Sequence, residues 1–235
     1  MQRGKVIIIE GIIGAGKSSF TRELAAEFGT GTLHLQEPDE KNNANPYLAD
    51  FYTSQQRWSY TMQTHLLQAR YKMHLHAQWH AMTTGENAVL DRSYFGDTAF
   101  ARLQLKMGDM SQREFDTYQS IYHAMTAHVL LPNVCVHLRV SPEVARQRII
   151  RRMEDETGRR CEDVISLQYL QDLSIEEEQV VKVLEAQGVK ILNLPWDEDR
   201  NDASSRHEMI RDIAGYITQY QPPGDMFLDL HRRTV

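Results

Sequence analysis

The sequence has few cysteines, no long apolar run and no excess of positive charge. Only two of its 235 residues are cysteines, Cys135 and Cys161, which is too few for a disulfide framework and is typical of reduced thiols in a cytoplasmic compartment. No stretch approaches the roughly 18 to 20 apolar residues that span a bilayer, so we expect no membrane partner. Lysine and arginine total 26 against 32 acidic residues, and this net charge of −6 leads us to expect no nucleic-acid partner.

The length and composition fit one globular domain. Hydrophobic residues make up 41% of the chain and charged residues 25%, which is ordinary for a protein with a sizeable core. We expect residues 1–220 to form that domain. The remaining 221–235 open with Pro-Pro-Gly and read either as a loose arm or as an oligomer contact.

Short apolar runs alternate with segments of helical spacing, which predicts an α/β fold with a parallel sheet. The runs are rich in Val, Ile and Leu rather than strictly alternating, as expected for strands covered by helices on both faces. The five predicted strands are Lys5–Ile9, Thr32–Leu35, Ala88–Leu90, Asn133–Leu138 and Lys190–Leu194. Helices are expected over 17–28, 45–82 (a short one and a long one), 95–107, 111–130, 142–152, 166–187 and 204–220.

A phosphate-binding loop follows the first predicted strand. Residues 11–18 match G-x-x-x-x-G-K-[ST], and a predicted helix follows directly. Glycines let backbone N–H groups turn towards phosphates, Lys17 would reach the β- and γ-phosphates, and Ser18 would ligate Mg²⁺. The alternative, a glycine-rich turn that binds nothing, fits the surrounding strand and helix less well. The predicted ATP contacts of the loop are Gly11, Ile12, Ile13, Gly14, Ala15, Gly16, Lys17, Ser18 and Ser19.

Charged residues stand at the ends of the second and third predicted strands, where the carboxyl ends of parallel strands line a binding crevice. Glu37 could accept the proton of an attacking hydroxyl. Arg92 could hold a transferring phosphoryl group, and Asp91 could reach the metal directly or through water. Each could equally be a capping or turn residue, but together with the loop they favour catalysis. We therefore predict Lys17, Glu37 and Arg92 as catalytic, and Ser18 and Asp91 as metal ligands.

From about residue 5 to about residue 200 the sequence resembles the deoxyribonucleoside kinase family, and especially its bacterial deoxyadenosine/deoxyguanosine kinase branch. No short motif after the loop is specific, but their order and spacing together are. The motifs that carry the resemblance are Ile9-Glu10-Gly11, Gln36-Glu37-Pro38, Asn45-Pro46-Tyr47-Leu48, Phe51-Tyr52, Arg57-Trp58-Ser59-Tyr60-Thr61-Met62-Gln63, Asp91-Arg92-Ser93, Ser141-Pro142-Glu143 and Ile165-Ser166-Leu167-Gln168-Tyr169-Leu170.

The resemblance implies a substrate site whose residues hold the sugar, the base and the 5′-hydroxyl. Glu37 would be the general base for that hydroxyl, with Arg92 beside it and the incoming phosphate. Gln63 and Arg70 are seven residues apart on a predicted helix, so their side chains would lie on the same face. The implied contacts are Tyr52 and Glu162 to the 3′-hydroxyl, Gln63 to the base edge, Arg70 with Asp97 as a charged pair found in purine and deoxycytidine kinases, and Met62 against the base.

Arginines crowd the segment after the fourth strand, which predicts a mobile lid over the triphosphate at about 152–163. Six arginines lie between Arg146 and Arg160. The resemblance implies that Arg148, Arg152 and Arg159 contact ATP. Five residues, 153–157, depart from the family pattern as an insertion with three acidic side chains. A solvated, salt-bridged helix end is the alternative.

These residues predict an Mg²⁺-dependent kinase with a P-loop NTPase fold, a five-stranded parallel sheet flanked by helices and an arginine-rich lid. It would transfer the γ-phosphate of ATP to the 5′-hydroxyl of a deoxynucleoside, with a purine favoured. A deoxynucleoside monophosphate kinase and a non-catalytic ATP-binding regulatory subunit remain alternatives. The resemblance also implies a homodimer. His74, His76 and His80 lack companion ligands at suitable spacing, so we expect packing or surface roles for them.

Overall fold

The computed structural model describes residues 4–38, 45–155, 165–198 and 203–221. Within them lies one five-stranded sheet with the order β2-β3-β1-β4-β5, in which all neighbouring strands run parallel. This confirms the predicted α/β fold. The strands are β1 (Val6–Glu10), β2 (Leu33–Leu35), β3 (Ala88–Asp91), β4 (Val134–Arg139) and β5 (Lys190–Pro195).

Strand β1 is the centre of the sheet. Val6 pairs with Ala88 of β3, and Ile7 pairs with Val134 of β4. All five residues of β1 are buried, because helices cover both faces, and this is why the strand is a continuous apolar run. The next residues, from Gly11 onward, therefore start at the middle of the sheet's carboxyl edge.

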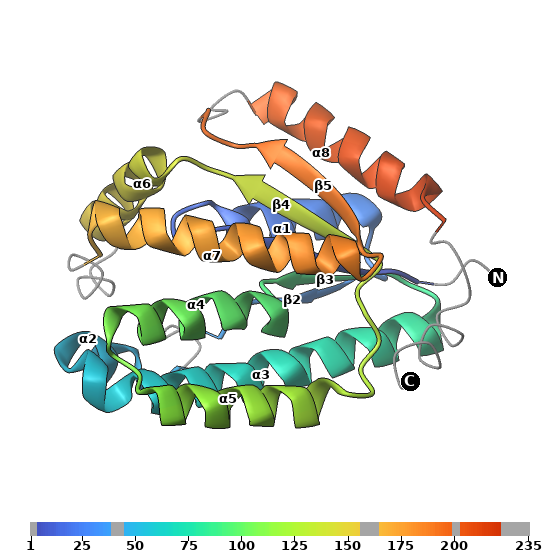
Figure 1. Cartoon of the computed structure of the whole chain (residues 1–235). Coiled ribbons are helices and arrows are strands. Elements are labelled where there is room, and N and C mark those ends of the chain that lie inside the picture. Colours follow the sequence, from blue (N-terminus) through green and yellow to red (C-terminus); the bar gives the residue numbers. More distant parts are fainter. Residues whose placement is uncertain (1–3, 39–44, 156–164, 199–202, 222–235) are drawn as a thin grey trace.

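Helices form a layer on each face of the sheet (Figure 1). Helices α1 and α8 pack against each other on one face. On the other face α4 packs between α3 and α7, and α5 packs outside α3 and α4. Helix α6 stands near the carboxyl ends of the strands, beside α7. The helices are α1 (Lys17–Phe28), α2 (Leu48–Thr53), α3 (Gln55–Thr84), α4 (Tyr94–Met107), α5 (Gln112–Thr126), α6 (Pro142–Asp155), α7 (Leu167–Ala186) and α8 (Ala203–Gln219).

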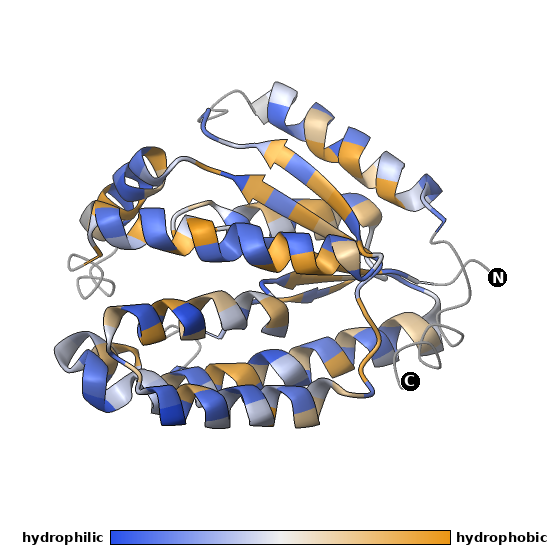
Figure 2. Cartoon of the chain, in the orientation of Figure 1, coloured by the Kyte–Doolittle hydropathy of each residue, from blue (hydrophilic) through white to orange (hydrophobic). Residues whose placement is uncertain are grey.

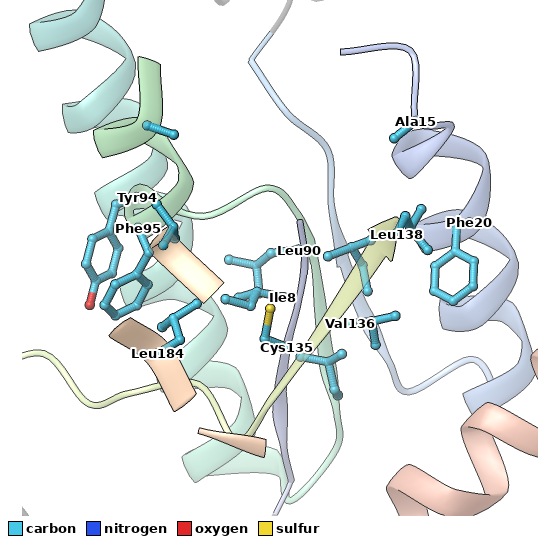
Figure 3. Close-up of a cluster of buried hydrophobic side chains, with 14 of the residues drawn as sticks. Ile8, Ala15, Phe20, Leu90, Tyr94, Phe95, Cys135, Val136, Leu138 and Leu184 are labelled. Atoms are coloured by element: carbon cyan, nitrogen blue, oxygen red, sulfur yellow. The ribbon is translucent and has the colours of Figure 1, made fainter. Parts of the chain in front are cut away.

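The main core lies on both sides of the sheet. In Figure 3, Ile8, Leu90 and Cys135 of the strands stand between Phe20 of α1 on one side and Leu184 of α7 on the other. Figure 2 shows β4 and β5 as largely hydrophobic and the helices as mixed, which is the pattern of helices that bury one face only. A smaller cluster around Phe51, Met62 and Leu66 joins α2 to α3.

Two helix ends differ from the sequence prediction. Helix α5 ends at Thr126 rather than near Leu130. Beyond this end, the Leu130 carbonyl accepts hydrogen bonds from the side chains of His74 and Gln78 on α3. Helix α6 continues to Asp155, so residues 153–155 of the proposed insertion extend the helix. The other lid residues, Cys161 and most of the tail lie outside the described residues.

The predicted break between α4 and α5 is confirmed. Gly108 ends α4 in the left-handed region, with φ 78°, a conformation that glycine adopts without steric cost. Ser111 begins α5 with a capping box, in which its hydroxyl accepts from the Glu114 N–H and the Glu114 carboxylate accepts from the Ser111 N–H. None of the described helices is long and apolar enough to span a membrane.

The contact between α7 and the sheet gives a stability prediction. Leu184 is fully buried against the sheet, whereas its neighbour Val183 is 53% exposed. Leu184→Ala should lower the free energy of unfolding by about 2–5 kcal/mol, because it leaves a cavity, and Val183→Ala should change it by less than about 1 kcal/mol. Urea unfolding monitored by circular dichroism measures both. Equal losses would show that α7 is not held by this contact.

Candidate active site

The charged residues singled out in the sequence meet at the carboxyl edge of the sheet. Glu10 ends β1, Asp91 ends β3, and Arg92 follows directly. Glu37 follows β2 by two residues. Because the strands are parallel and in register, their ends bring these side chains together with the start of α1.

The loop between β1 and α1 depends on three glycines. Gly11, Gly14 and Gly16 have φ values of 148°, 82° and 85°, which L side chains rarely adopt. A side chain at Gly14 would also come within 2.4 Å of the carbonyl oxygen of Ala145, at the start of α6. Gly16 precedes α1, so the N–H groups of the first helical turn lie at the loop and can bind an anion.

Lys17 lies within this loop and is buried. Its Nζ donates to the carbonyl oxygens of Gly11 at 3.0 Å and Ile12 at 3.1 Å. Burial and the nearby Arg92 lower the pKa of Lys17 to about 8. Phosphate oxygens at the loop would offer the ammonium group a charged acceptor in place of the two carbonyls.

Asp91 and Ser18 form a site that fits Mg²⁺. Asp91 is buried, and its Oδ1 has no hydrogen-bond partner among the described residues. Burial and the negative charge of Glu37 raise the pKa of Asp91, while Lys17 and the Ser18 hydroxyl counter that rise. One carboxylate and one hydroxyl beside a phosphate site suit Mg²⁺, which keeps several waters and phosphate oxygens as ligands. The described residues contain no cluster of three or more His, Cys, Asp or Glu side chains that could bind a metal.

Arg92 is the most constrained residue of the site. Its φ is 66°, the one positive value among described non-glycine residues, and its side chain is 1% exposed. Strained backbone of this kind costs on the order of 1–3 kcal/mol and concentrates at functional sites. Its Nη1 donates to Glu177 Oε1 at 2.5 Å, its Nη2 donates to the Gly11 carbonyl at 2.9 Å, and its Nε lies 3.1 Å from Glu37 Oε1. The carboxylates that surround Arg92 raise its pKa against the effect of burial.

Ser93 connects this arginine to the start of α4. The Ser93 hydroxyl accepts from the N–H groups of Phe95 and Gly96, and it donates to Glu10 Oε1. A side chain at Gly96 would come within 2.3 Å of Glu10 Oε2, so a larger residue here would displace the Glu10 carboxylate. The helix cap thus holds Glu10, Ser93 and Arg92 as one unit.

Arg70 joins Glu37 to α4. Its Nη2 donates to Glu37 Oε1 and its Nη1 donates to Asp97 Oδ1, while the Tyr118 hydroxyl on α5 donates to Asp97 Oδ2 at 2.5 Å. Burial alone would raise the pKa of Glu37, but Arg92, Arg70 and Lys17 lower it to about 2. Glu37 is therefore ionised at neutral pH and able to accept a proton.

Helix α3 also carries a buried amide that lacks a hydrogen-bond partner among the described residues. Neither the Oε1 nor the Nε2 of Gln63 makes a hydrogen bond within the described residues, although the side chain is fully buried. Buried polar groups are normally satisfied, so an unpaired amide on α3 indicates a place for a ligand. The ring of Phe100 lies 4.7 Å from the Arg92 guanidinium carbon and 5.9 Å from that of Arg70.

Comparison with known proteins agrees with this arrangement. The family model described as deoxynucleoside kinase matches residues 7–218. The chain belongs to the deoxynucleoside kinase family. Among curated relatives, it is similar to a deoxyadenosine/deoxycytidine kinase of Bacillus subtilis, with 31% identity over 93% of this chain and 96% of that one. It is also 29% identical to a deoxyadenosine kinase of Dictyostelium discoideum, over 94% of this chain and 84% of that one.

A solved structure of another deoxynucleoside kinase has the same fold. It is the deoxyadenosine kinase of M. mycoides with the products dCMP and a flexible dCDP bound, and it is similar with a TM-score of 0.72 and 26% identity. The alignment covers 90% of this chain and 99% of that one. The P-loop fold and the kinase family predicted from the sequence are both confirmed.

The kinase structure brings most of the predicted site residues together. Ion pairs and longer-range electrostatic interactions join five of them into one network: Lys17, Glu37, Arg70, Arg92 and Asp97. Gln63 and Met62 are buried on α3, and Tyr52 packs against Met62 in the smaller cluster. On α6, Arg148 donates through Nη2 to the carbonyl oxygens of Trp196 at 2.8 Å and Asp197 at 3.3 Å, and Arg152 is half-buried. Arg159 and Glu162 lie outside the described residues.

Several residues of the network were missed in the sequence. Glu177 stands in a run of three glutamates that reads as a solvated helix face, and Tyr118 lies on a helix with no motif. Phe100 has the spacing of an ordinary core residue. Glu10 offered a signal, since a carboxylate at the end of a buried apolar strand requires a polar partner.

The network predicts a pH dependence of stability. Burial and Glu177 raise the pKa of Glu10 from 4.5 to about 7, against Arg92, Ser93 and Lys17. The folded protein therefore keeps a proton that the unfolded chain releases above about pH 4.5. The free energy of unfolding should fall as pH rises from about 4.5 through about 7, by roughly 3 kcal/mol from this group.

Glu10→Gln removes the titration and keeps the shape. Urea unfolding at about pH 5 and about pH 8 should show a larger loss for the wild type than for this variant. Parallel pH profiles would mean that Glu10 is ionised over the whole range.

Proposed function

We propose that the protein transfers the γ-phosphate of ATP to the 5′-hydroxyl of a purine deoxynucleoside, with Glu37 as the general base. The observation that carries this proposal is the position of Glu37. It lies at the carboxyl edge of the sheet between Arg70 and Arg92, within electrostatic reach of Lys17 on the phosphate loop. A base that takes a hydroxyl proton must stand near both the acceptor and the phosphate, and a carboxylate near Lys17 of the phosphate loop supports this role for Glu37.

Glu37 accepts the proton of the 5′-hydroxyl as that oxygen attacks the γ-phosphorus. With a pKa of about 2 it is fully ionised but only weakly basic. A triphosphate at the loop brings negative charge close to Lys17 and Arg92, and negative charge raises the pKa of a nearby carboxyl. Binding of ATP thus raises the basicity of Glu37 before the proton of the 5′-hydroxyl is transferred.

Lys17 and Arg92 neutralise charge on the transferring phosphoryl group. Both are buried, and buried cations interact strongly with a phosphate because water screens them little. Ser18 and Asp91 would hold Mg²⁺, which supplies further neutralisation of the phosphate oxygens when bound. In this proposal the N–H groups of the loop and of the first turn of α1 complete the phosphate site, with Gly11 to Ser19 as the contacts to ATP.

The base of the nucleoside lies against α3 and α4 in this proposal. The unpaired amide of Gln63 offers one donor and one acceptor, which suits an adjacent donor–acceptor pair on a purine edge. Arg70 and Asp97 stand beside it, and Met62 and Tyr52 supply apolar contact. Tyr52 and Glu162 would hold the 3′-hydroxyl.

The arginines of the acceptor side argue against a nucleoside monophosphate as the acceptor. A monophosphate kinase needs a guanidinium group that is available to the acceptor phosphate. Arg70 is paired with Glu37 and Asp97, and Arg92 is paired with Glu37 and Glu177. Arg148, Arg152 and Arg159 remain proposed contacts to ATP from α6 and the lid, and a homodimer in the cytoplasm remains a proposal from the family resemblance.

Glu37→Gln tests the base. We expect kcat to fall by about 10²–10⁴-fold, because the amide cannot accept the proton, while the dissociation constant of the deoxynucleoside changes little. Coupled ADP-release assays and titration calorimetry measure the two quantities. Near-normal turnover would remove Glu37 from the base role.

The wild-type enzyme should first be tested with Mg·ATP and three sets of acceptors. These are the four deoxynucleosides, their 5′-monophosphates and the matching ribonucleosides. Turnover on deoxyadenosine or deoxyguanosine supports the proposal. Turnover confined to the monophosphates would overturn the role of Glu37 and leave the phosphate loop as it is.

The pair Arg70 and Asp97 should set the ranking of bases. Replacing both, as Arg70→Met with Asp97→Ala, should lower kcat for every acceptor, since Arg70 also contacts Glu37. The ratio of kcat/KM for thymidine to that for deoxyadenosine should nevertheless rise at least about tenfold, because the charged pair no longer faces the base. An unchanged ratio would show that the pair does not contact the base.

A further inference from the structure

Glu177 reaches the active site from α7. This helix packs on the sheet, on α4 and on α6. The Glu177 side chain is 1% exposed, and its Oε1 accepts from Nη1 of Arg92 at 2.5 Å. A carboxylate this deeply buried is tolerated only when it is paired, so Glu177 and Arg92 depend on each other.

The two arginines of the site are balanced in the same way. Each contacts Glu37 on one side and a second carboxylate on the other: Asp97 for Arg70, and Glu177 for Arg92. We infer that Glu177 is a positioning residue of the kinase reaction. It orients the Arg92 guanidinium towards the phosphate loop and prevents Arg92 from forming a closer ion pair with Glu37. This inference rests on the proposed function.

Two hydrogen bonds and one ion pair orient the Arg92 guanidinium. Glu177 takes Nη1, the Gly11 carbonyl takes Nη2 at 2.9 Å, and Glu37 lies 3.1 Å from Nε. Gly11 belongs to the phosphate loop, so the guanidinium faces the place where a phosphoryl group is held. Without Glu177 the nearest remaining carboxylate is Glu37, and the Arg92 guanidinium would turn towards this proposed general base.

Glu10 is a weaker partner of Arg92 than Glu177 is. Its Oε1 accepts from the N–H and the hydroxyl of Ser93, and its Oε2 lies 3.8 Å from Nη1 of Arg92, beyond hydrogen-bond distance. Glu177 Oε1 lies 2.5 Å from the same nitrogen. The described carboxylate that binds Nη1 of Arg92 directly is therefore the one on α7.

Loss of the Glu177 charge also acts on the basicity of Glu37. If Arg92 no longer pairs with Glu177, its guanidinium can approach Glu37 more closely. The ionised form of Glu37 is then stabilised further, which lowers the pKa of Glu37. A weaker base should transfer the proton more slowly. The charged groups that face Arg92 from the surrounding elements are Glu10 of β1, Lys17 of α1, Glu37 after β2, Arg70 of α3, Asp91 of β3, Asp97 of α4 and Glu177 of α7.

The test compares Glu177→Gln with Glu178→Gln in the full-length protein, using Mg·ATP and the best deoxynucleoside. Glu178 is the next residue of α7, 41% exposed and paired with Arg139 at 3.5 Å, so it is a matched control. Glu177→Gln should lower kcat by about 10- to 100-fold, the loss of one charge-assisted hydrogen bond, with both KM values within about threefold of the wild type. Glu178→Gln should keep the wild-type kcat.

A double-mutant cycle with Arg92→Lys shows whether Glu177 acts through Arg92. In the Arg92→Lys background, Glu177→Gln should cost less than about threefold further, because the guanidinium that it positions is gone. A residue with only a structural role would lower the melting temperature and reduce kcat by the same factor in both backgrounds. That additive result would overturn the inference, as would equal losses for Glu177→Gln and Glu178→Gln.

If Glu177→Gln does not fold, Glu177→Asp carries the test, since it keeps the charge but withdraws it by one methylene. A lower kcat with unchanged KM supports the inference, and wild-type kcat overturns it. The wild-type assay separates the two levels of the argument. No turnover on any deoxynucleoside would sink the proposed function, whereas wild-type turnover with a fully active Glu177 variant would sink this inference alone.

Discussion

The structure depends on one buried guanidinium. Arg92 is 1% exposed, has a left-handed backbone conformation and contacts the loop carbonyl of Gly11 and the carboxylates of Glu37 and Glu177. A buried charge is costly unless each of its donors is matched, so the elements around it must be placed accurately. Strand ends, phosphate loop and helix α7 are held together by the need to satisfy this one side chain.

The loop is subject to a second constraint, which is close backbone approach. Gly14 lies so near the start of α6 that a side chain would reach the Ala145 carbonyl, and Gly96 lies equally near the Glu10 carboxylate. These contacts bring β1, α4 and α6 closer than larger residues would allow. The phosphate loop therefore lies close to buried charges, and electrostatic interactions between buried groups are strong.

Much of the fold was readable because its cause is local. The five apolar runs became the five strands with ends shifted by about one residue, since burial on both faces requires continuous Val, Ile and Leu. The predicted end of α5 was wrong by four residues, and in the segment that follows it His74 and Gln78 of α3 bind the Leu130 carbonyl. Tertiary hydrogen bonds of this kind leave no pattern near the residues that they affect.

The sequence by itself determined the phosphate loop, the parallel sheet and the family, because glycine positions, apolar runs and motif order are local properties of the chain. Only the tertiary structure decided how the charges are paired. Glu176, Glu177 and Glu178 are identical in kind, yet only Glu177 points at Arg92, while Glu176 pairs with Arg102 and Lys106 and Glu178 with Arg139. The rotation of α7 about its axis determines which of the three glutamates faces Arg92. Packing between residues that are far apart in the sequence sets this rotation.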